Sequence, residues 1–230
     1  MNAILYPVEA PEEPGIMTDL DDNRDKRLTA PELGGCTGDN SADLPGYVRR
    51  ATRRWIEHVV VGFGFCPYAA AVLDTENALH IDVCESDNDS ESVQDAALQR
   101  LSSIARQMVD NPDPETALIV MPQGLDDFYD YLDLLADAED LLQREQLTGV
   151  LQLASFHPDY RFDNTLIDDA ANFTNRSPFP MLHILREEIV ERLIGEGDFA
   201  STIPERNIET ARSKGFDAMR TALRRCMEIQ

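Results

Sequence analysis

The middle of the chain alternates between strand-like and helix-like patterns, and this alternation limits the possible folds more than any other feature. Apolar residues recur at every second position in residues 78–84, and short apolar runs fill residues 116–121 and 150–156. Between these runs, residues 92–109 and 125–146 carry apolar side chains at three- and four-residue steps, the period of an amphipathic helix. Such alternation predicts an α/β fold with right-handed crossovers.

The crossovers predict a small three-stranded sheet, largely parallel, with flanking helices. Strands joined in this way run in the same direction, so their carboxyl ends meet at one edge, where ligands bind in open α/β sheets. Here Glu85, Gln123 and His157 lie just beyond these ends. A mixed, ferredoxin-like sheet is the alternative, and it would separate the three ends.

The segments outside this alternation predict further helices. Residues 44–61 place their apolar side chains on one stripe. In the C-terminal third, Ser177 suits an N-cap and Pro178 the first helical position, and apolar residues continue at helical spacing as far as residue 194. A capping box beginning at Thr202 opens another helix. We therefore expect a helical C-terminal third.

The first forty residues differ in composition from the rest of the chain. They hold several prolines and many acidic side chains, and they show no sustained period. Low apolar content with net negative charge favours disorder. We therefore predict a disordered acidic arm over residues 1–40, followed by one globular α/β domain over residues 44–230.

The whole chain is strongly acidic, with 43 Asp and Glu residues against 20 Lys and Arg residues and a net charge of −23. Such a surface repels phosphate backbones and anionic lipids, so we expect no nucleic-acid or membrane partner. No apolar run reaches the length of a membrane span, and the first residues lack the regions of a secretory signal. We expect a cytoplasmic protein whose four cysteines, without C-x-x-C spacing, are free thiols.

Side chains able to carry chemistry collect after the third predicted strand and in one upstream loop. His157 and Asp159 follow that strand directly, and His183 lies in the helix predicted after Ser177. Cys66 lies in a reversal of the chain rich in Gly and Pro, where a reactive thiol would be placed. An imidazole has a pKa suited to activating a thiol, so we predict Cys66 as a nucleophile with His157 or His183 as its base. Asp159 would orient that base.

A second set of polar side chains is suited to holding a substrate. Arg176 and Arg186 can bind a carboxylate or phosphate through paired N–H groups. The amides of Asn172 and Asn175 can donate to an oxyanion. These four residues predict a ligand-binding site for a small anionic substrate.

Two other interpretations remain open at this point. A divalent metal could be held by His157, Asp159 and His183, with Cys66 or water completing the site, although no helical His spacing supports it. Alternatively, a non-catalytic module could bind an anion or a peptide through the Asn- and Arg-containing loop, or that loop could be purely structural. The sequence indicates no particular cofactor and no oligomeric state.

Short motifs in the chain carry a resemblance to a known family. They are Cys66-Pro67-Tyr68-Ala69, Phe156-His157-Pro158-Asp159-Tyr160-Arg161-Phe162, Asn172-Phe173-Thr174-Asn175-Arg176-Ser177-Pro178-Phe179-Pro180, His183-Ile184-Leu185-Arg186-Glu187 and Glu205-Arg206-Asn207. Through them the chain resembles, over about residues 47–219, a bacterial family known as a domain of unknown function, number 1415. That family has no assigned activity, so the resemblance implies membership without chemistry. The residues themselves predict a small enzyme, hydrolase- or transferase-like, with a Cys/His/Asp/Arg site.

Overall fold

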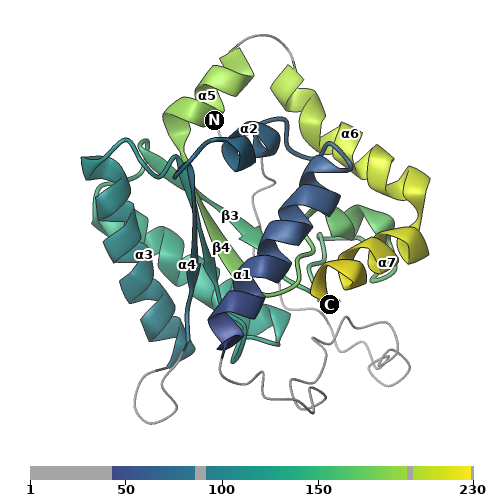
Figure 1. The fold of residues 1–230 in the computed structure, drawn as a ribbon, viewed down its shortest axis with the longest axis horizontal. Helices are drawn as coiled ribbons and strands as arrows, with labels where there is room; N and C mark the ends of the chain where they lie inside the picture. Colours follow the sequence, from purple (N-terminus) through teal and green to yellow (C-terminus); the bar gives the residue numbers. More distant parts are fainter. Residues whose placement is uncertain (1–42, 86–91, 196–198, 229–230) are drawn as a thin grey trace.

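The part of the chain that can be described comprises residues 43–85, 92–195 and 199–228 of a computed structural model (Figure 1). The predicted acidic arm lies outside these residues, so the division into an arm and one domain stays a prediction. No helix in the described ranges has both the length and the apolar character needed to cross a bilayer.

The sheet has four strands in the order β1-β2-β4-β3. They are β1 (Leu79–Val83), β2 (Thr116–Val120), β3 (Leu151–Phe156) and β4 (Met181–Arg186). β1 and β2 pair in parallel, whereas β4 is antiparallel to both of its neighbours, β2 and β3. It follows that β1, β2 and β3, the three strands predicted from the sequence, all run in the same direction. The α/β class and the helical C-terminal part are confirmed, with four strands instead of three.

The fourth strand corrects the prediction of a helix beginning at Ser177. β4 is a central strand, and Met181, Leu182 and Ile184 are fully buried between the two layers that flank the sheet. A strand covered on both faces is an unbroken apolar run, which periodicity alone cannot distinguish from a buried helix. The hydroxyl of Ser177 donates to the carbonyl oxygen of Phe179 at 2.6 Å and caps no helix. Helical structure begins only with α5 (Glu187–Gly195).

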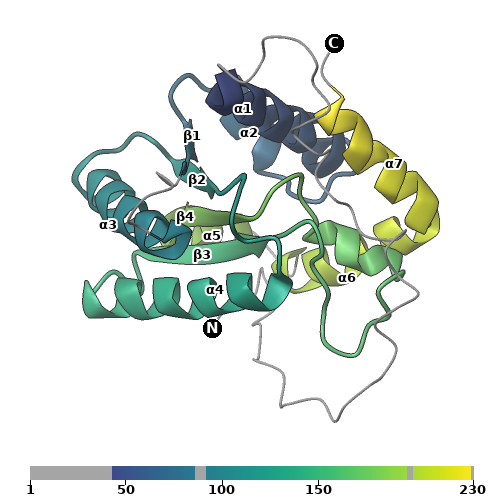
Figure 2. The same cartoon turned by 90° about the horizontal axis from the view of Figure 1, so that it is seen from below.

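The two faces of the sheet are covered by different sets of helices (Figure 2). α3 (Val93–Asp110) and α4 (Phe128–Arg144) cover one face, and their buried apolar side chains form a single core with those of the strands beneath. The opposite face carries α1 (Leu44–Trp55), the π-helix η3 (Ile56–Val61), α2 (Ala69–Asp74), α6 (Phe199–Lys214) and α7 (Phe216–Met227). Alternate residues of the central strands therefore enter separate cores, as expected from the two-residue period of a strand.

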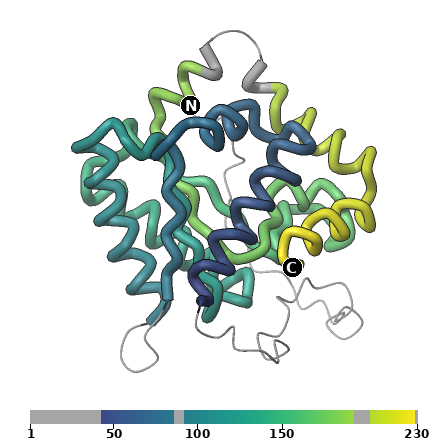
Figure 3. The backbone as a smooth tube through the Cα atoms, in the orientation of Figure 1, coloured from purple at the N-terminus to yellow at the C-terminus, as the bar shows by residue number. Residues whose placement is uncertain are grey.

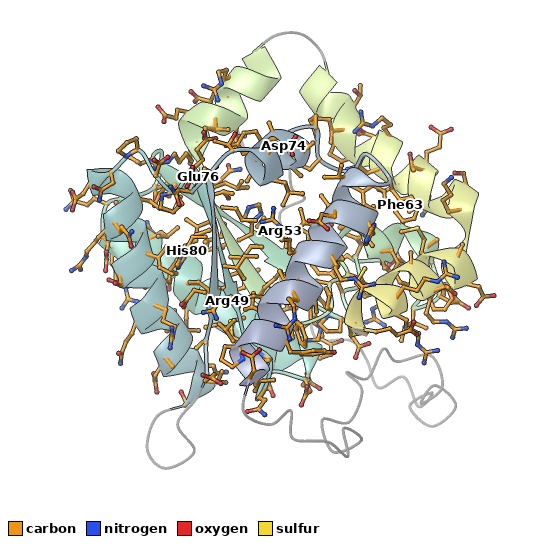
Figure 4. The ribbon with its side chains drawn as sticks, viewed as in Figure 1. Arg49, Arg53, Phe63, Asp74, Glu76 and His80 are labelled. Carbon is orange, nitrogen blue, oxygen red and sulfur yellow. The ribbon has the colours of Figure 1, made fainter. Side chains whose placement is uncertain are left out.

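On the second face, α1 and η3 form one continuous helical rod, and a loop then connects the end of η3 to α2 (Figure 3). Two arginines of α1 attach this rod to neighbouring elements (Figure 4). Arg49 Nε donates to the carbonyl oxygen of Ile81 at 3.2 Å, on the edge of β1 that faces away from β2. Arg53 donates to the carbonyl oxygen of Leu73 at 3.3 Å. Occupying the outer edge of β1 protects it from pairing with another chain.

Candidate functional site

A cavity of about 160 Å³ lies between the sheet and the helices of its second face. Its floor includes Leu118, His183 and Ala154, which are direct neighbours across β2, β4 and β3. Its walls include Ile56 and Val60 of η3, Val72 of α2, Ile189 of α5 and Ile203 of α6. The cavity therefore lies over the face of the sheet, and not beyond the carboxyl edge where the sequence predicted a site.

Cys66 lines this cavity from the loop that joins η3 to α2. The chain reverses there through Gly64, whose φ of 70° lies in the left-handed region that favours glycine. Two neighbouring residues of α6 fix the loop. Arg206 Nη2 donates to the Gly64 carbonyl oxygen at 2.8 Å, and Asn207 Nδ2 donates to that of Phe65 at 2.7 Å. The position of Cys66 thus depends on α6, which is far away in the sequence.

The surroundings of Cys66 favour the neutral thiol. Burial raises the pKa of Cys66 above its ordinary value of 9.0. The backbone N–H groups of Tyr68 and Ala69 donate to the sulfur and, together with the charge of Arg206, offset only part of this effect. At neutral pH the sulfur is therefore protonated.

His183 lies in the floor of the same cavity and is also uncharged. Its Nε2 lies 2.7 Å from Thr116 Oγ1, and that hydroxyl donates to the carbonyl oxygen of Ile184 at 2.7 Å. The Phe156 ring lies 6.0 Å from the imidazole. Burial lowers the pKa of His183 to about 4, so the ring is neutral at physiological pH.

Of the two asparagines predicted to bind a ligand, only Asn175 lines the cavity. Its Nδ2 donates to the Ser155 carbonyl oxygen at 3.1 Å. Asn172 is fully buried elsewhere: its Oδ1 accepts from the Phe162 N–H at 3.1 Å, and its Nδ2 donates to the Leu166 carbonyl oxygen at 2.9 Å. Asn172 thus closes the loop that follows β3.

His157 and Asp159 are not brought together with Cys66. The His157 ring lies 5.2 Å from the rings of Phe128 and Tyr131, on the α4 side of the sheet. Both ring nitrogens are engaged, since Nδ1 accepts from the Asp159 N–H at 3.0 Å and Nε2 lies 3.0 Å from the Leu125 carbonyl oxygen. His157 therefore ties the turn after β3 to the start of α4, and its separation from His183 corrects the expected convergence.

The same separation bears on the metal interpretation. His157 and His183 project to opposite faces of the sheet, so the two imidazoles and Asp159 do not surround one point. Within the described ranges, no three side chains of His, Cys, Asp or Glu are grouped in a way that could hold a metal ion.

Arg176 is buried away from the cavity lining, with 2% of its surface exposed. Its Nε donates to the Tyr160 carbonyl oxygen at 3.1 Å and its Nη2 to that of Ile167 at 2.9 Å. The guanidinium lies 4.8 Å from the ring centre of Phe173 and 5.8 Å from that of Phe216. Arg176 thus holds the loop after β3 against α7.

Arg186 also serves the backbone and does not line the cavity. Its Nη2 donates to the carbonyl oxygens of Asn111, Pro112 and Pro114 at 2.7, 3.2 and 3.0 Å. This cluster fixes the connection between α3 and β2 to the end of β4. The geometry therefore brings together Cys66, His183 and Asn175, and leaves the other predicted site residues elsewhere.

Sequence reasoning missed four polar residues of the cavity: Thr116, Tyr68, Thr174 and Asn207. The Tyr68 hydroxyl donates to a carboxylate oxygen of Glu115. Tyr68 and Asn207 belong to motifs that carry the family resemblance, so a signal for them was present. Thr116 is simply the first residue of a strand, and only the pairing of β2 with β4 reveals its contact with His183.

Comparison with known proteins identifies one family. A family model described as "Protein of unknown function (DUF1415)" matches residues 47–221, a range that contains every residue lining the cavity. No curated protein and no solved structure matches the chain.

Proposed function

The chain belongs to the DUF1415 family, and we propose from its cavity that it binds a small, uncharged, largely apolar molecule. The observation that carries this proposal is the chemistry of the lining. Most of the described residues that line the cavity are aliphatic or aromatic, and none of them is Asp, Glu, Lys or Arg. An ion entering such a cavity would lose its hydration without gaining a counter-charge.

The ligand expected from the sequence was a small anion, and the proposal differs on that point. Arg176 and Arg186, the two guanidinium groups intended for an anion, donate to backbone carbonyl oxygens outside the cavity lining. The cavity volume of about 160 Å³ also limits the size of the ligand. An apolar cavity of about 150 Å³ is large enough to hold benzene. A ligand group the size of one aromatic ring therefore suits this site.

We expect toluene, as a neutral probe of this size, to stabilise the protein. At ten times its dissociation constant, a ligand that binds only the folded state raises the free energy of unfolding by about 1.4 kcal/mol. Ala154 is buried in the cavity floor beside His183. Ala154→Leu should therefore fill the cavity and abolish the effect. Urea unfolding with and without toluene measures both results.

The same substitution at an exposed alanine supplies the control. Ala70 lies on α2 but is exposed and does not line the cavity, so Ala70→Leu should respond to toluene as the wild type does. Absence of toluene stabilisation in the wild type, or an equal response in Ala154→Leu, would refute the proposed function.

A thiol-dependent enzyme is the second candidate, because Cys66 and His183 line the same cavity. Their pKa values weigh against it as the primary function. Burial raises the pKa of Cys66 above 9.0 and lowers that of His183 to about 4, so both shifts oppose transfer of the thiol proton to the imidazole. The resting pair is therefore neutral, and the thiolate needed for attack is scarce.

Alkylation of Cys66 by iodoacetamide distinguishes these candidates. In a Cys36→Ser background, the rate at Cys66 should rise with pH and show an inflection above pH 9.0, because burial raises the pKa of this thiol. Mass spectrometry of the labelled peptides follows the reaction, and Cys66→Ser provides the blank. An inflection below pH 7 would instead support an activated nucleophile.

A further inference from the structure

We propose that His183 selects a ligand carrying one hydrogen-bond donor, such as the hydroxyl group of a phenol or an alcohol. This inference rests on the proposed function and names the chemical class of its ligand. The ring nitrogen that would accept this donor is Nδ1. Three observations support the assignment: the tautomer of His183, the accessibility of Nδ1 and the state of the other polar groups in the cavity.

The tautomer follows from the hydrogen bonds of Thr116. The Ile184 carbonyl oxygen can only accept, so the single hydroxyl proton of Thr116 is donated to it at 2.7 Å. Thr116 Oγ1 must then accept from His183 Nε2, which lies 2.7 Å away. Nε2 therefore carries the ring proton, and Nδ1 of the neutral ring presents a lone pair.

That lone pair is accessible from within the cavity. Among the described residues, Nδ1 of His183 has no hydrogen-bond partner. The buried side-chain nitrogen and oxygen atoms without a partner in these residues are Thr52 Oγ1 and Arg186 Nε, so Nδ1 is not sealed by its surroundings. His183 lies between Leu118 and Ala154 in the sheet, is partly exposed and lines the cavity.

Three other polar groups of the cavity already donate a hydrogen bond. Asn175 Nδ2 donates to the Ser155 carbonyl oxygen, and Asn207 Nδ2 donates to that of Phe65. The Tyr68 hydroxyl donates to Glu115. The cavity thus offers an unused acceptor, and a ligand whose polar group is a donor completes it.

Phenol and toluene are a matched pair of probes, because they differ only in exchanging a hydroxyl group for a methyl group. We expect the affinity of phenol relative to toluene to be about tenfold higher in the wild type than in His183→Phe. Tenfold corresponds to about 1.4 kcal/mol, the size of the net contribution of one hydrogen bond. Titration calorimetry of both ligands with both proteins measures the ratio, and benzoate serves as an anionic probe of similar size.

The outcomes separate the inference from the proposed function. If toluene binds but the ratio is the same in both proteins, the selection by His183 is overturned and the apolar site remains. If neither phenol nor toluene binds the wild type, or if benzoate binds as well as toluene, the proposed function itself fails.

Two further measurements do not depend on the folding of His183→Phe. A long-range ¹H–¹⁵N spectrum of the wild type should place the His183 ring proton on Nε2, and a proton on Nδ1 would overturn the inference. Thr116→Val removes the acceptor that holds this tautomer and leaves the imidazole in place. It should lower the preference for phenol severalfold, and an unchanged preference would count against the role of Thr116.

Discussion

Replacing Arg176 with alanine is expected to lower the free energy of unfolding by about 4 kcal/mol. The guanidinium is 2% exposed and donates to two backbone carbonyl oxygens, those of Tyr160 and Ile167. Hydrogen bonds from a charged group contribute about 1.5–3 kcal/mol each, and the truncation also removes the packing on Phe173 and Phe216. Urea unfolding followed by circular dichroism measures the loss.

Arg161→Ala is the matched control for this experiment. Arg161 is exposed, and its contact with the Tyr129 hydroxyl is long at 3.5 Å, so the loss should stay below about 0.5 kcal/mol. Arg176→Met retains much of the side-chain volume and removes the buried charge, so it should destabilise less than Arg176→Ala. If Arg176→Ala kept wild-type stability and abolished toluene binding, the structural role of Arg176 would be wrong.

Acidification from pH 7 to pH 4 is expected to remove about 3 kcal/mol of stability through His183 alone. Burial lowers the pKa of this imidazole to about 4 in the folded protein, against 6.5 for the free side chain. Between these values the unfolded chain takes up a proton that the folded protein does not, so stability falls as the pH falls through this window. Each pH unit within it corresponds to about 1.4 kcal/mol.

Comparison with His183→Phe isolates this contribution. Carboxylates, and His157, whose pKa is also lowered by burial, titrate in both proteins and cancel in the difference. The free energy of unfolding, measured at pH 7 and pH 4 for both proteins, should fall by about 3 kcal/mol more in the wild type. Parallel losses would show that His183 is protonated in the folded protein as easily as in the unfolded chain.

The sequence predicted the parts of the fold whose patterns are local. β1, β2 and β3 follow alternating or short apolar runs, and α3 and α4 follow clear helical periods, so their existence and order were foreseeable. β4 was not, because Met181–Arg186 carries apolar residues on both faces and leads directly into a true helix, α5. Its neighbours β2 and β3 are distant in the chain, so no local sequence pattern indicates that β4 pairs with them.

The candidate site was predictable only in part, for the same reason. Cys66 and His183 were noticed as residue types suited to chemistry, and both line the cavity. His157 attracted equal attention, yet its ring is occupied by the Leu125 carbonyl oxygen and the Asp159 N–H. Such contacts depend on how α4 lies against the end of β3. The identity of a residue therefore indicated which chemistry is possible. Only the hydrogen-bond partners of its side chain indicate whether that side chain is available for such chemistry.

The late position of β4 in the chain has a consequence for biosynthesis. β2 and β3 do not pair with each other: β2 pairs with β1, but β3 reaches the sheet only through β4. While the first 180 residues leave the ribosome, β3 therefore has no partner, and its backbone must remain hydrated or shielded by other molecules. The sheet is completed when six residues insert between two strands that were translated earlier. A nascent chain truncated before Met181 would expose two apolar strand edges to its neighbours in the polysome.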